Sequence, residues 1–212
     1  MMRNSKPVFI RGRNKSSAIF LASILALLVG LATRAADGRA QDVEPCYRDR
    51  TASQWMEALR TADAAGRSEA AYCLGQMKAE AAVPLLQTVA QKDPDHFVRA
   101  EAVYALGNIS ARSALPLLAQ LLKQDAITGV RGAAATALGN MAADSGAIIP
   151  VLIAALQGDK SEYVRGCAAL ALGRIGAGAR DALPSLRESA ANDRSPVVRR
   201  RADEAIQRIE SP

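Results

Sequence analysis

The stretch that decides the fold is VRAEAVYALGNI, residues Val98 to Ile109, because the chain contains four further versions of it. They read GRSEAAYCLGQM from Gly66, VRGAAATALGNM from Val130, VRGCAALALGRI from Val164 and VRRRADEAIQRI from Val198. Each version carries an arginine at the same place, and these arginines recur at a nearly constant spacing: Arg67, Arg99, Arg131, Arg165 and Arg199. Internal repeats of this length predict stacked helical hairpins.

Two further sets of residues keep the same period. Prolines and aspartates each recur in phase with the arginines: Pro84, Pro116, Pro150, Pro184; Asp93, Asp125, Asp159, Asp193. The number of residues from each proline to the valine that begins the next repeat stretch is constant, as from 84 to 98 and from 116 to 130. The step from the repeat glycine to the next proline instead grows along the chain, from 75 to 84 in the first case and from 139 to 150 in the third. We therefore expect insertions in one connection of the hairpin only.

One repeat predicts two amphipathic helices. In the segment 113–124, apolar side chains recur at i, i+3 and i+7 as Leu115, Leu118 and Leu122, which is the spacing of one helix face. Pro116 falls in the first turn, where its missing N–H removes no hydrogen bond. The turn DAITG follows, and a second helix is expected over 130–141.

Small residues occupy two columns of the second helices. They are Ala70, Ala102, Ala134, Ala168, and Gly75, Gly107, Gly139, Gly173. Side chains of this size allow helix backbones to approach closely. A single hairpin leaves much apolar surface exposed, so we expect the hairpins to bury it by stacking.

The first-helix proline, the turn aspartate and the pattern VRxxAAxALGxI resemble HEAT repeats, of the alanine-rich kind named after phycobilisome lyase subunits. The resemblance covers about residues 81 to 209 and implies an all-α, right-handed α-solenoid. It also implies that the aspartate and arginine columns form a hydrogen-bond ladder between neighbouring turns, which is an architectural role.

Both ends of the array depart from the repeat pattern. Residues 51–77 resemble an opening hairpin with Trp55 in its first helix, and Tyr47 and Arg48 are expected in the same cap. The total is then about five HEAT-like hairpins, or ten helices. The last hairpin has serines at 185 and 189 where its predecessors are apolar, which predicts a terminal cap with a polar outer face.

The N-terminal region predicts export. Residues 1–35 hold six basic and no acidic side chains, and the apolar run 18–32 precedes the small-residue pattern Thr33-Arg34-Ala35. We interpret residues 1–35 as a signal peptide, 36–46 as a linker and 47–212 as the HEAT-repeat domain. The expected location is the periplasm or the extracellular space, and an uncleaved signal that anchors the chain to the membrane is the alternative.

Charge and residue usage disfavour several functions. Without the segment 1–35, 27 − 6 = 21 basic side chains balance 21 acidic ones, which argues against a nucleic-acid partner. The chain has one histidine, His96, expected in a solvated turn, so we expect no metal, cofactor or catalytic residue. Cys73 stands in a column of alanines and is expected to be buried, with a disulfide to Cys46 left open; Cys167 lies too far along the stack to reach it.

The remaining candidate is a binding face. The resemblance implies that the second helices line a concave surface, and tyrosine, amide and charged side chains alternate there. The candidate partner-binding residues are Tyr72, Gln76, Glu101, Tyr104, Asn108, Thr136, Asn140, Leu170 and Arg174. Tyrosines beside amide side chains suit recognition of a protein or peptide. Ordinary solvent-facing residues would give the same pattern.

The sequence thus predicts a monomeric, non-enzymatic scaffold or adaptor that binds a protein or peptide on its concave surface. A chromophore lyase subunit is the alternative that the resemblance implies. An accessory module of an envelope complex would share the same fold.

Overall fold

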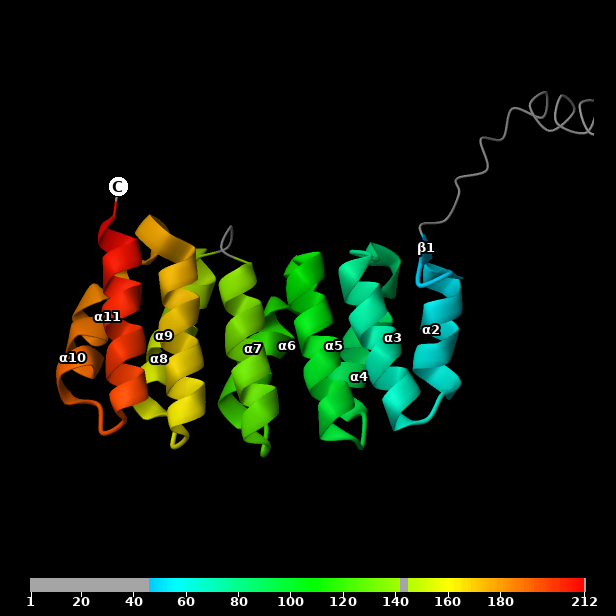
Figure 1. The fold of residues 1–212 in the computed structure, drawn as a ribbon, viewed down its shortest axis with the longest axis horizontal. Helices are drawn as coiled ribbons and strands as arrows, with labels where there is room; N and C mark the ends of the chain where they lie inside the picture. The colour runs from blue at the N-terminus through cyan, green and yellow to red at the C-terminus, as the bar shows by residue number, and fades with distance from the viewer. Residues whose placement is uncertain (1–45, 142–144, 212) are drawn as a thin grey trace, which may run out of the picture. The chain divides into compact units, whose positions relative to one another are not determined.

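A computed structural model describes residues 46–141 and 145–211. The predicted signal peptide, and the linker up to residue 45, lie outside these residues. Ten α-helices of the described part pair into five antiparallel hairpins (Figure 1), which confirms the predicted all-α solenoid. The pairs are α2 (Ala52–Thr61) with α3 (Ala64–Gln76), α4 (Val83–Lys92) with α5 (His96–Ile109), α6 (Leu115–Gln124) with α7 (Thr128–Asn140), α8 (Ser145–Gly158) with α9 (Glu162–Ile175), and α10 (Leu183–Asn192) with α11 (Pro196–Glu210).

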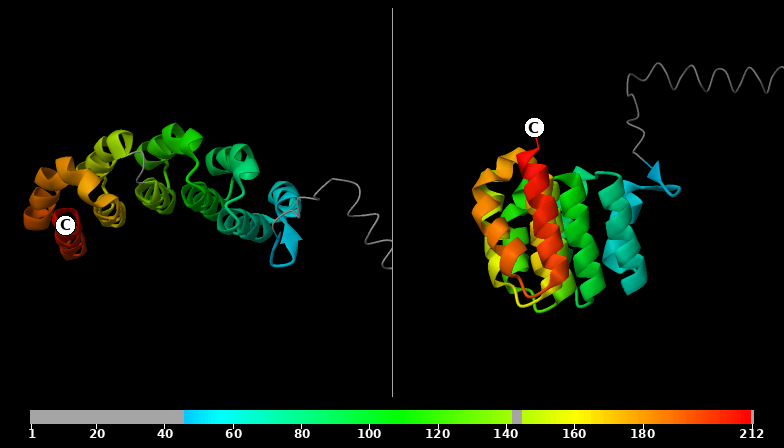
Figure 2. Two further views of the ribbon diagram at one scale, coloured as in Figure 1. Left: turned by 90° about the horizontal axis from the view of Figure 1, so that it is seen from above. Right: turned by 60° about the vertical axis from the view of Figure 1, so that its left-hand side comes forward.

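The second helices form the inner layer of the repeat array. Seen from above in Figure 2, α3, α5, α7, α9 and α11 lie on the inside of the bend, and α4, α6, α8 and α10 lie on the outside. The inner helices contact one another extensively, whereas successive outer helices make few contacts. Because the inner layer is packed more tightly, the stack of hairpins bends towards it.

Glycine–alanine contacts explain the tight inner layer. A Cβ atom on Gly107 would lie 2.7 Å from the Cα atom of Ala137 in the next hairpin. The same contact recurs at each inner boundary, as Gly75 to Ala105, Gly139 to Ala171 and Gly173 to Ala205. A side chain at these positions would collide with backbone, so the predicted role of the glycine column is confirmed.

The arginine of each of the first four repeats joins two hairpins, whereas Arg199 of the last repeat donates to the carbonyl oxygen of Asp193 in its own hairpin. Arg131 donates from Nε and Nη2 to both carboxylate oxygens of Asp159 in the next hairpin, at 2.8 and 3.0 Å. Its Nη1 donates to the carbonyl oxygen of Asp125 in its own hairpin, at 2.9 Å. Three more rungs have the same bidentate form: Arg67 to Asp93, Arg99 to Asp125 and Arg165 to Asp193. The structure therefore shows the ladder that the resemblance implied.

The connections differ among the hairpins. Short 3₁₀ segments precede three of the first helices: η1 (Glu80–Ala82), η2 (Arg112–Ala114) and η4 (Gly176–Ala182). The prolines of α4, α6 and α10 lie in the first turn, as expected for Pro116. In α8 the helix begins at Ser145, so Pro150 lies inside it. The longer connection there is taken up by an earlier helix start.

A short β-ribbon caps the first hairpin. Strands β1 (Cys46–Tyr47) and β2 (Arg50–Thr51) pair antiparallel, and the two loop residues Arg48 and Asp49 have φ values of 51° and 60°. Positive φ at both central residues is the geometry of a tight type I′ hairpin turn. The indole N–H of Trp55 donates to the carbonyl oxygen of Tyr47 at 3.0 Å and ties the ribbon to α2. This confirms that Tyr47 and Arg48 belong to the opening cap.

The closing cap has exposed polar side chains, as predicted, but one of the two serines does not contribute to them. Arg187, Glu188 and Asn192 are polar residues of α10, but Ser189 is buried and does not contribute to a polar outer face. It takes the place that Val89 and Leu121 occupy in α4 and α6, because the last hairpin still packs that side of α10 inwards. The polar surface of the cap is therefore formed by the residues around Ser189.

Candidate binding surface on the inner helices

The inner surface carries most of the predicted site residues. Tyr72, Gln76, Asn108, Asn140 and Arg174 reach solvent most fully, while Glu101, Tyr104, Thr136 and Leu170 are partly buried. All lie on α3, α5, α7 or α9, at the spacing of one helical face. They do not form one cluster: four of them line a hollow between α3 and α5, and most of the others lie on α7 and α9.

Four of the predicted residues line one hollow. Tyr72 from α3 and Glu101, Tyr104 and Asn108 from α5 surround a space of about 260 Å³, with Ala105 also in its lining. A buried water takes up about 30 Å³, so the hollow has room for several waters or for the end of one long side chain. Burial raises the pKa of Glu101. The hollow thus combines two aromatic rings, an amide and a carboxyl group that is partly withdrawn from water.

The β-ribbon adds an arginine beside this hollow. Arg48 Nη1 donates to Glu69 Oε1 at 2.7 Å, and its Cζ atom lies 5.9 Å from the ring centroids of both Tyr47 and Tyr72. The two rings meet edge to face, 6.5 Å apart. Tyr47 and Arg48 lie in the cap as predicted, but their contact with the inner surface is not indicated by the sequence. That contact depends on the left-handed backbone of the turn, which the residue types Arg48 and Asp49 do not indicate.

Tyr163 adds a further aromatic ring to the inner surface, and it is not among the residues predicted from the sequence. Its ring lies against α7 at Gly132, where an added Cβ atom would be 2.3 Å from the ring. Burial, together with the neighbouring Cys167 and Tyr104, raises the pKa of Tyr163. A signal was present, because Tyr163, Leu170 and Arg174 follow one another at i, i+7 and i+11 on a single helix face.

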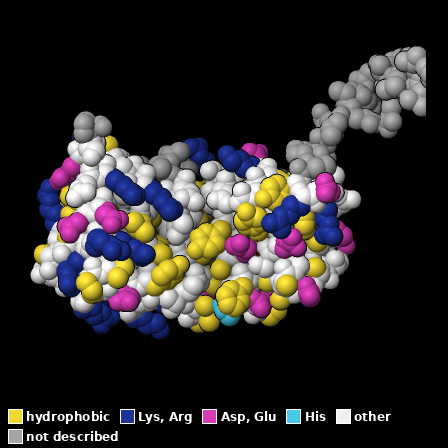
Figure 3. Space-filling model, in the orientation of Figure 1, with side chains coloured by type: hydrophobic (Ala, Val, Ile, Leu, Met, Phe, Trp, Pro, Cys, Tyr) yellow, Lys and Arg dark blue, Asp and Glu magenta, His cyan; other side chains and the backbone are white. Residues whose placement is uncertain are grey.

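The remaining predicted residues lie towards the C-terminal end. Arg174 Nη1 donates to Asn140 Oδ1 at 3.0 Å, which links α9 to α7 across the surface. The Thr136 hydroxyl donates to the carbonyl oxygen of Gly132 at 3.0 Å, so its hydrogen bond is made within α7. Arginine side chains of α9 and α11 lie at this end, with acidic side chains among them (Figure 3). The inner surface therefore carries charges of both signs at this end.

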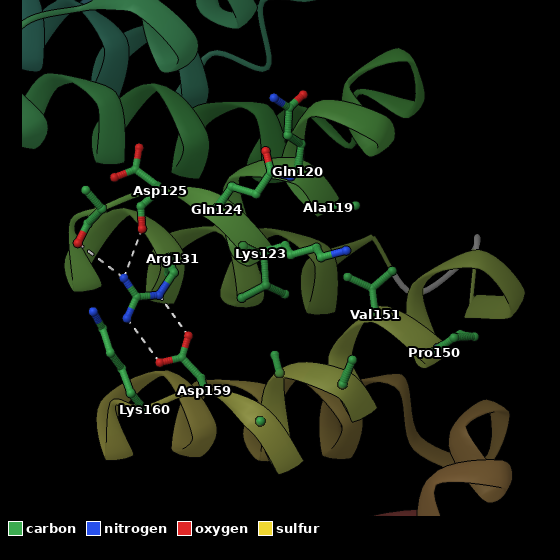
Figure 4. A pocket seen from close by; sticks show the side chains of 15 residues that line it. Ala119, Gln120, Lys123, Gln124, Asp125, Arg131, Pro150, Val151, Asp159 and Lys160 are labelled. Atoms are coloured by element: carbon green, nitrogen blue, oxygen red, sulfur yellow. Dashed lines mark hydrogen bonds and ion pairs between the residues drawn. The ribbon is translucent and has the colours of Figure 1, made fainter.

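A larger groove lies on the other layer, between α6 and α8 (Figure 4). It encloses about 910 Å³. Small residues of α8 open it, because Ala155 stands where α4 has Val89 and α6 has Leu121, and Gly158 stands where α4 has Lys92. At one end the ladder contact between Arg131 and Asp159 crosses the groove. This groove is not among the sites predicted from the sequence.

Other expected features can be placed in the described part. Cys73 and Cys167 are buried free thiols, so the structure contains no disulfide at Cys73. His96 begins α5 and stacks on Phe97 with ring centroids 4.2 Å apart, rather than lying in a turn. Residues 46–141 and 145–211 contain no cluster of His, Cys, Asp and Glu side chains suited to a metal ion. None of the described helices is long and apolar enough to cross a membrane.

Comparison with known proteins agrees with this architecture. A family model described as HEAT repeats matches residues 52–139 and 124–207, so the chain belongs to the HEAT-repeat proteins. A solved structure of the complex of CpcE and CpcF of phycocyanin lyase from Nostoc sp. PCC7120 is 26% identical, with a TM-score of 0.64. The match covers 82% of this chain and 69% of that one. The repeats are accordingly of the phycobilisome lyase type.

Two further comparisons add little. Human deoxyhypusine hydroxylase in complex with glycerol is 23% identical over 75% of this chain and 84% of that one, with a TM-score of 0.36. At that TM-score the similarity carries no argument about function. A search of curated proteins finds no match.

Proposed function

We propose that the protein is an exported, non-enzymatic scaffold or adaptor that binds a protein partner along its inner helices. The observation that carries this proposal is the hollow between α3 and α5, where Tyr72, Tyr104, Glu101 and Asn108 converge. Tyrosine offers a large contact area and a hydroxyl group with few rotatable bonds, and it is enriched in protein interfaces. The similar structure is itself a complex of two proteins, which supports a protein partner.

The test is affinity capture with two single-residue variants. Tyr104→Ala removes a ring from the hollow, and we expect it to lose the partner that the unchanged protein retains. Gln91→Ala alters an exposed residue of the outer helix α4 and should retain that partner. Equal recovery of the same partner by Tyr104→Ala and Gln91→Ala would contradict binding at this surface.

A chromophore lyase subunit is the second candidate, and the likeness to a phycocyanin lyase complex favours it. The two functions differ in one observable product. Incubation with a bilin and an acceptor protein should leave the acceptor without covalently attached chromophore if the protein is a scaffold. Visible absorbance that remains with the denatured acceptor, and that depends on this protein, would establish the lyase function instead.

Export is a separate part of the proposal. It rests on the basic start, the apolar run 18–32 and the small residues that follow it. Sequencing the N-terminus of the mature protein from cell fractions should give a start near residue 36 in the exported fraction. A chain that begins at Met1 and stays in the cytosol would contradict it.

A further inference from the structure

The first two repeats place the same two residues at the same positions of the inner surface. Glu69 and Tyr72 lie on α3, and Glu101 and Tyr104 lie one repeat later on α5. Each pair is spaced i, i+3, so carboxyl group and ring share one helix face. The two pairs differ in what fills the space in front of them.

In the first repeat the pair holds an arginine from the same chain. Arg48 makes a 2.7 Å ion pair with Glu69 and lies 5.9 Å from the ring of Tyr72. A guanidinium group within about 6 Å of a ring centroid is attracted to the face of the ring. The turn that delivers it has two non-glycine residues with positive φ, a backbone conformation that is unfavourable for such residues. The ribbon therefore supplies Arg48 to this pair despite a conformational cost.

In the second repeat the equivalent pair faces the hollow. Tyr72 closes it on the α3 side, and Asn108 adds an amide group from the next turn of α5. Among residues 46–141 and 145–211, no side chain forms an ion pair or a hydrogen bond with Glu101. Burial of a carboxyl group without a partner is unfavourable, and a cation that enters the hollow would remove this penalty.

We propose that this hollow binds an arginine side chain of the partner protein, in the way that Glu69 and Tyr72 bind Arg48. The guanidinium group donates to the Glu101 carboxylate and to Asn108 Oδ1, and it stacks between the rings of Tyr104 and Tyr72. A planar guanidinium suits this site better than a lysine ammonium, because it donates in a fork and stacks on rings. The inference rests on the proposed function and specifies the chemistry of its recognition.

The later repeats do not combine a carboxylate with an aromatic ring at these positions. Their equivalent pairs are Ala133 with Thr136, Cys167 with Leu170, and Arg201 with Glu204. One arginine of the partner would therefore set its position along the described helices.

The test is titration with N-acetyl-arginine methylamide, followed through the ring signals of carbon-13-labelled tyrosines. We expect saturable shifts of the Tyr72 and Tyr104 signals, with affinity lowered about tenfold or more by Glu101→Gln. N-acetyl-citrulline methylamide has the same shape without the charge and should cause no saturable shift. Glu80→Gln changes an acidic residue outside the hollow and should bind like the unchanged protein. Equal binding of the citrulline compound, or unaltered binding by folded Glu101→Gln protein, would overturn the proposal.

Further variants test the role of the ring, and partner capture by Glu101→Gln and Tyr104→Ala separates this inference from the proposed function. Tyr104→Phe keeps the ring and should retain arginine binding, whereas Tyr104→Leu should lose it. If Glu101→Gln captures the partner as well as the unchanged protein while Tyr104→Ala loses it, arginine recognition is wrong and the scaffold function stands. If the arginine compound binds as expected but Tyr104→Ala still captures the partner, the hollow binds a guanidinium and the scaffold function at this surface fails.

Discussion

At Gly107 and Gly132, a missing side chain makes room for two different neighbours. Gly107 lies against the backbone of Ala137 in the next hairpin, with 2.7 Å from an added Cβ atom to Cα. Gly132 lies against the ring of Tyr163, with 2.3 Å from an added Cβ atom to Cε1. Backbone in a packed stack cannot shift without moving a helix, whereas an exposed ring can rotate. The first glycine therefore supports the fold and the second shapes the binding surface.

This difference predicts opposite results for two matched substitutions. Gly107→Ala should lower the free energy of unfolding by about 1–3 kcal/mol, because α5 and α7 must separate. Gly132→Ala should change it little, since the higher helix propensity of alanine offsets the displaced ring. Urea denaturation measures both variants, and the Tyr163 ring signal should move in Gly132→Ala. Equal destabilisation by the two substitutions would contradict this account of the inner layer.

At the scale of the element, the ladder controls how the hairpins respond to acid. Hydrogen bonds from the Arg165 guanidinium hold the pKa of Asp193 below its ordinary value. Burial alone raises the pKa of Asp93 and Asp159, but the arginine and backbone hydrogen bonds outweigh it and the pKa of each is lowered. Each of these carboxylates therefore binds its proton less readily in the folded state than in the unfolded chain.

The sign of the pH dependence follows directly. Below the unfolded-state pKa of about 4, these aspartates become protonated in the unfolded chain while they are still ionised in the folded protein. The free energy of unfolding should be steady above about pH 5 and should fall as the pH drops through the lowered pKa values. Asp193→Asn should be less stable at neutral pH and should lose less stability on acidification. An acid response in Asp193→Asn as steep as that of the unchanged protein would rule out this rung as a contributor.

At the scale of the whole described array, the sequence was sufficient for the repeated features. The hairpins, the small-residue columns and the ladder recur at fixed spacings. They recur because each repeat must make the same packing contacts with its neighbours. Features that occur once were harder to predict. The approach of Arg48 to Tyr72 depends on a turn with positive φ, and the groove between α6 and α8 depends on the absence of larger side chains at Ala155 and Gly158.

The site could be predicted only in part for the same reason. The period of the second helices identified Tyr72, Glu101, Tyr104 and Asn108, and the structure brings these four together. It could not show that Thr136 bonds within its own helix or that Asn140 and Arg174 pair with each other. Side-chain partners across hairpins depend on the bend of the array, which no single repeat encodes.

Site-specific photo-cross-linking tests the central claim most directly. A photoreactive amino acid placed at Asn108, on the inner surface, should cross-link the captured partner, and the cross-link should disappear when Tyr104→Ala is added. The same amino acid at Gln91, on the outer helix α4, should give no cross-link to that partner. A partner that cross-links from position 91 and not from position 108 would contradict binding along the inner helices.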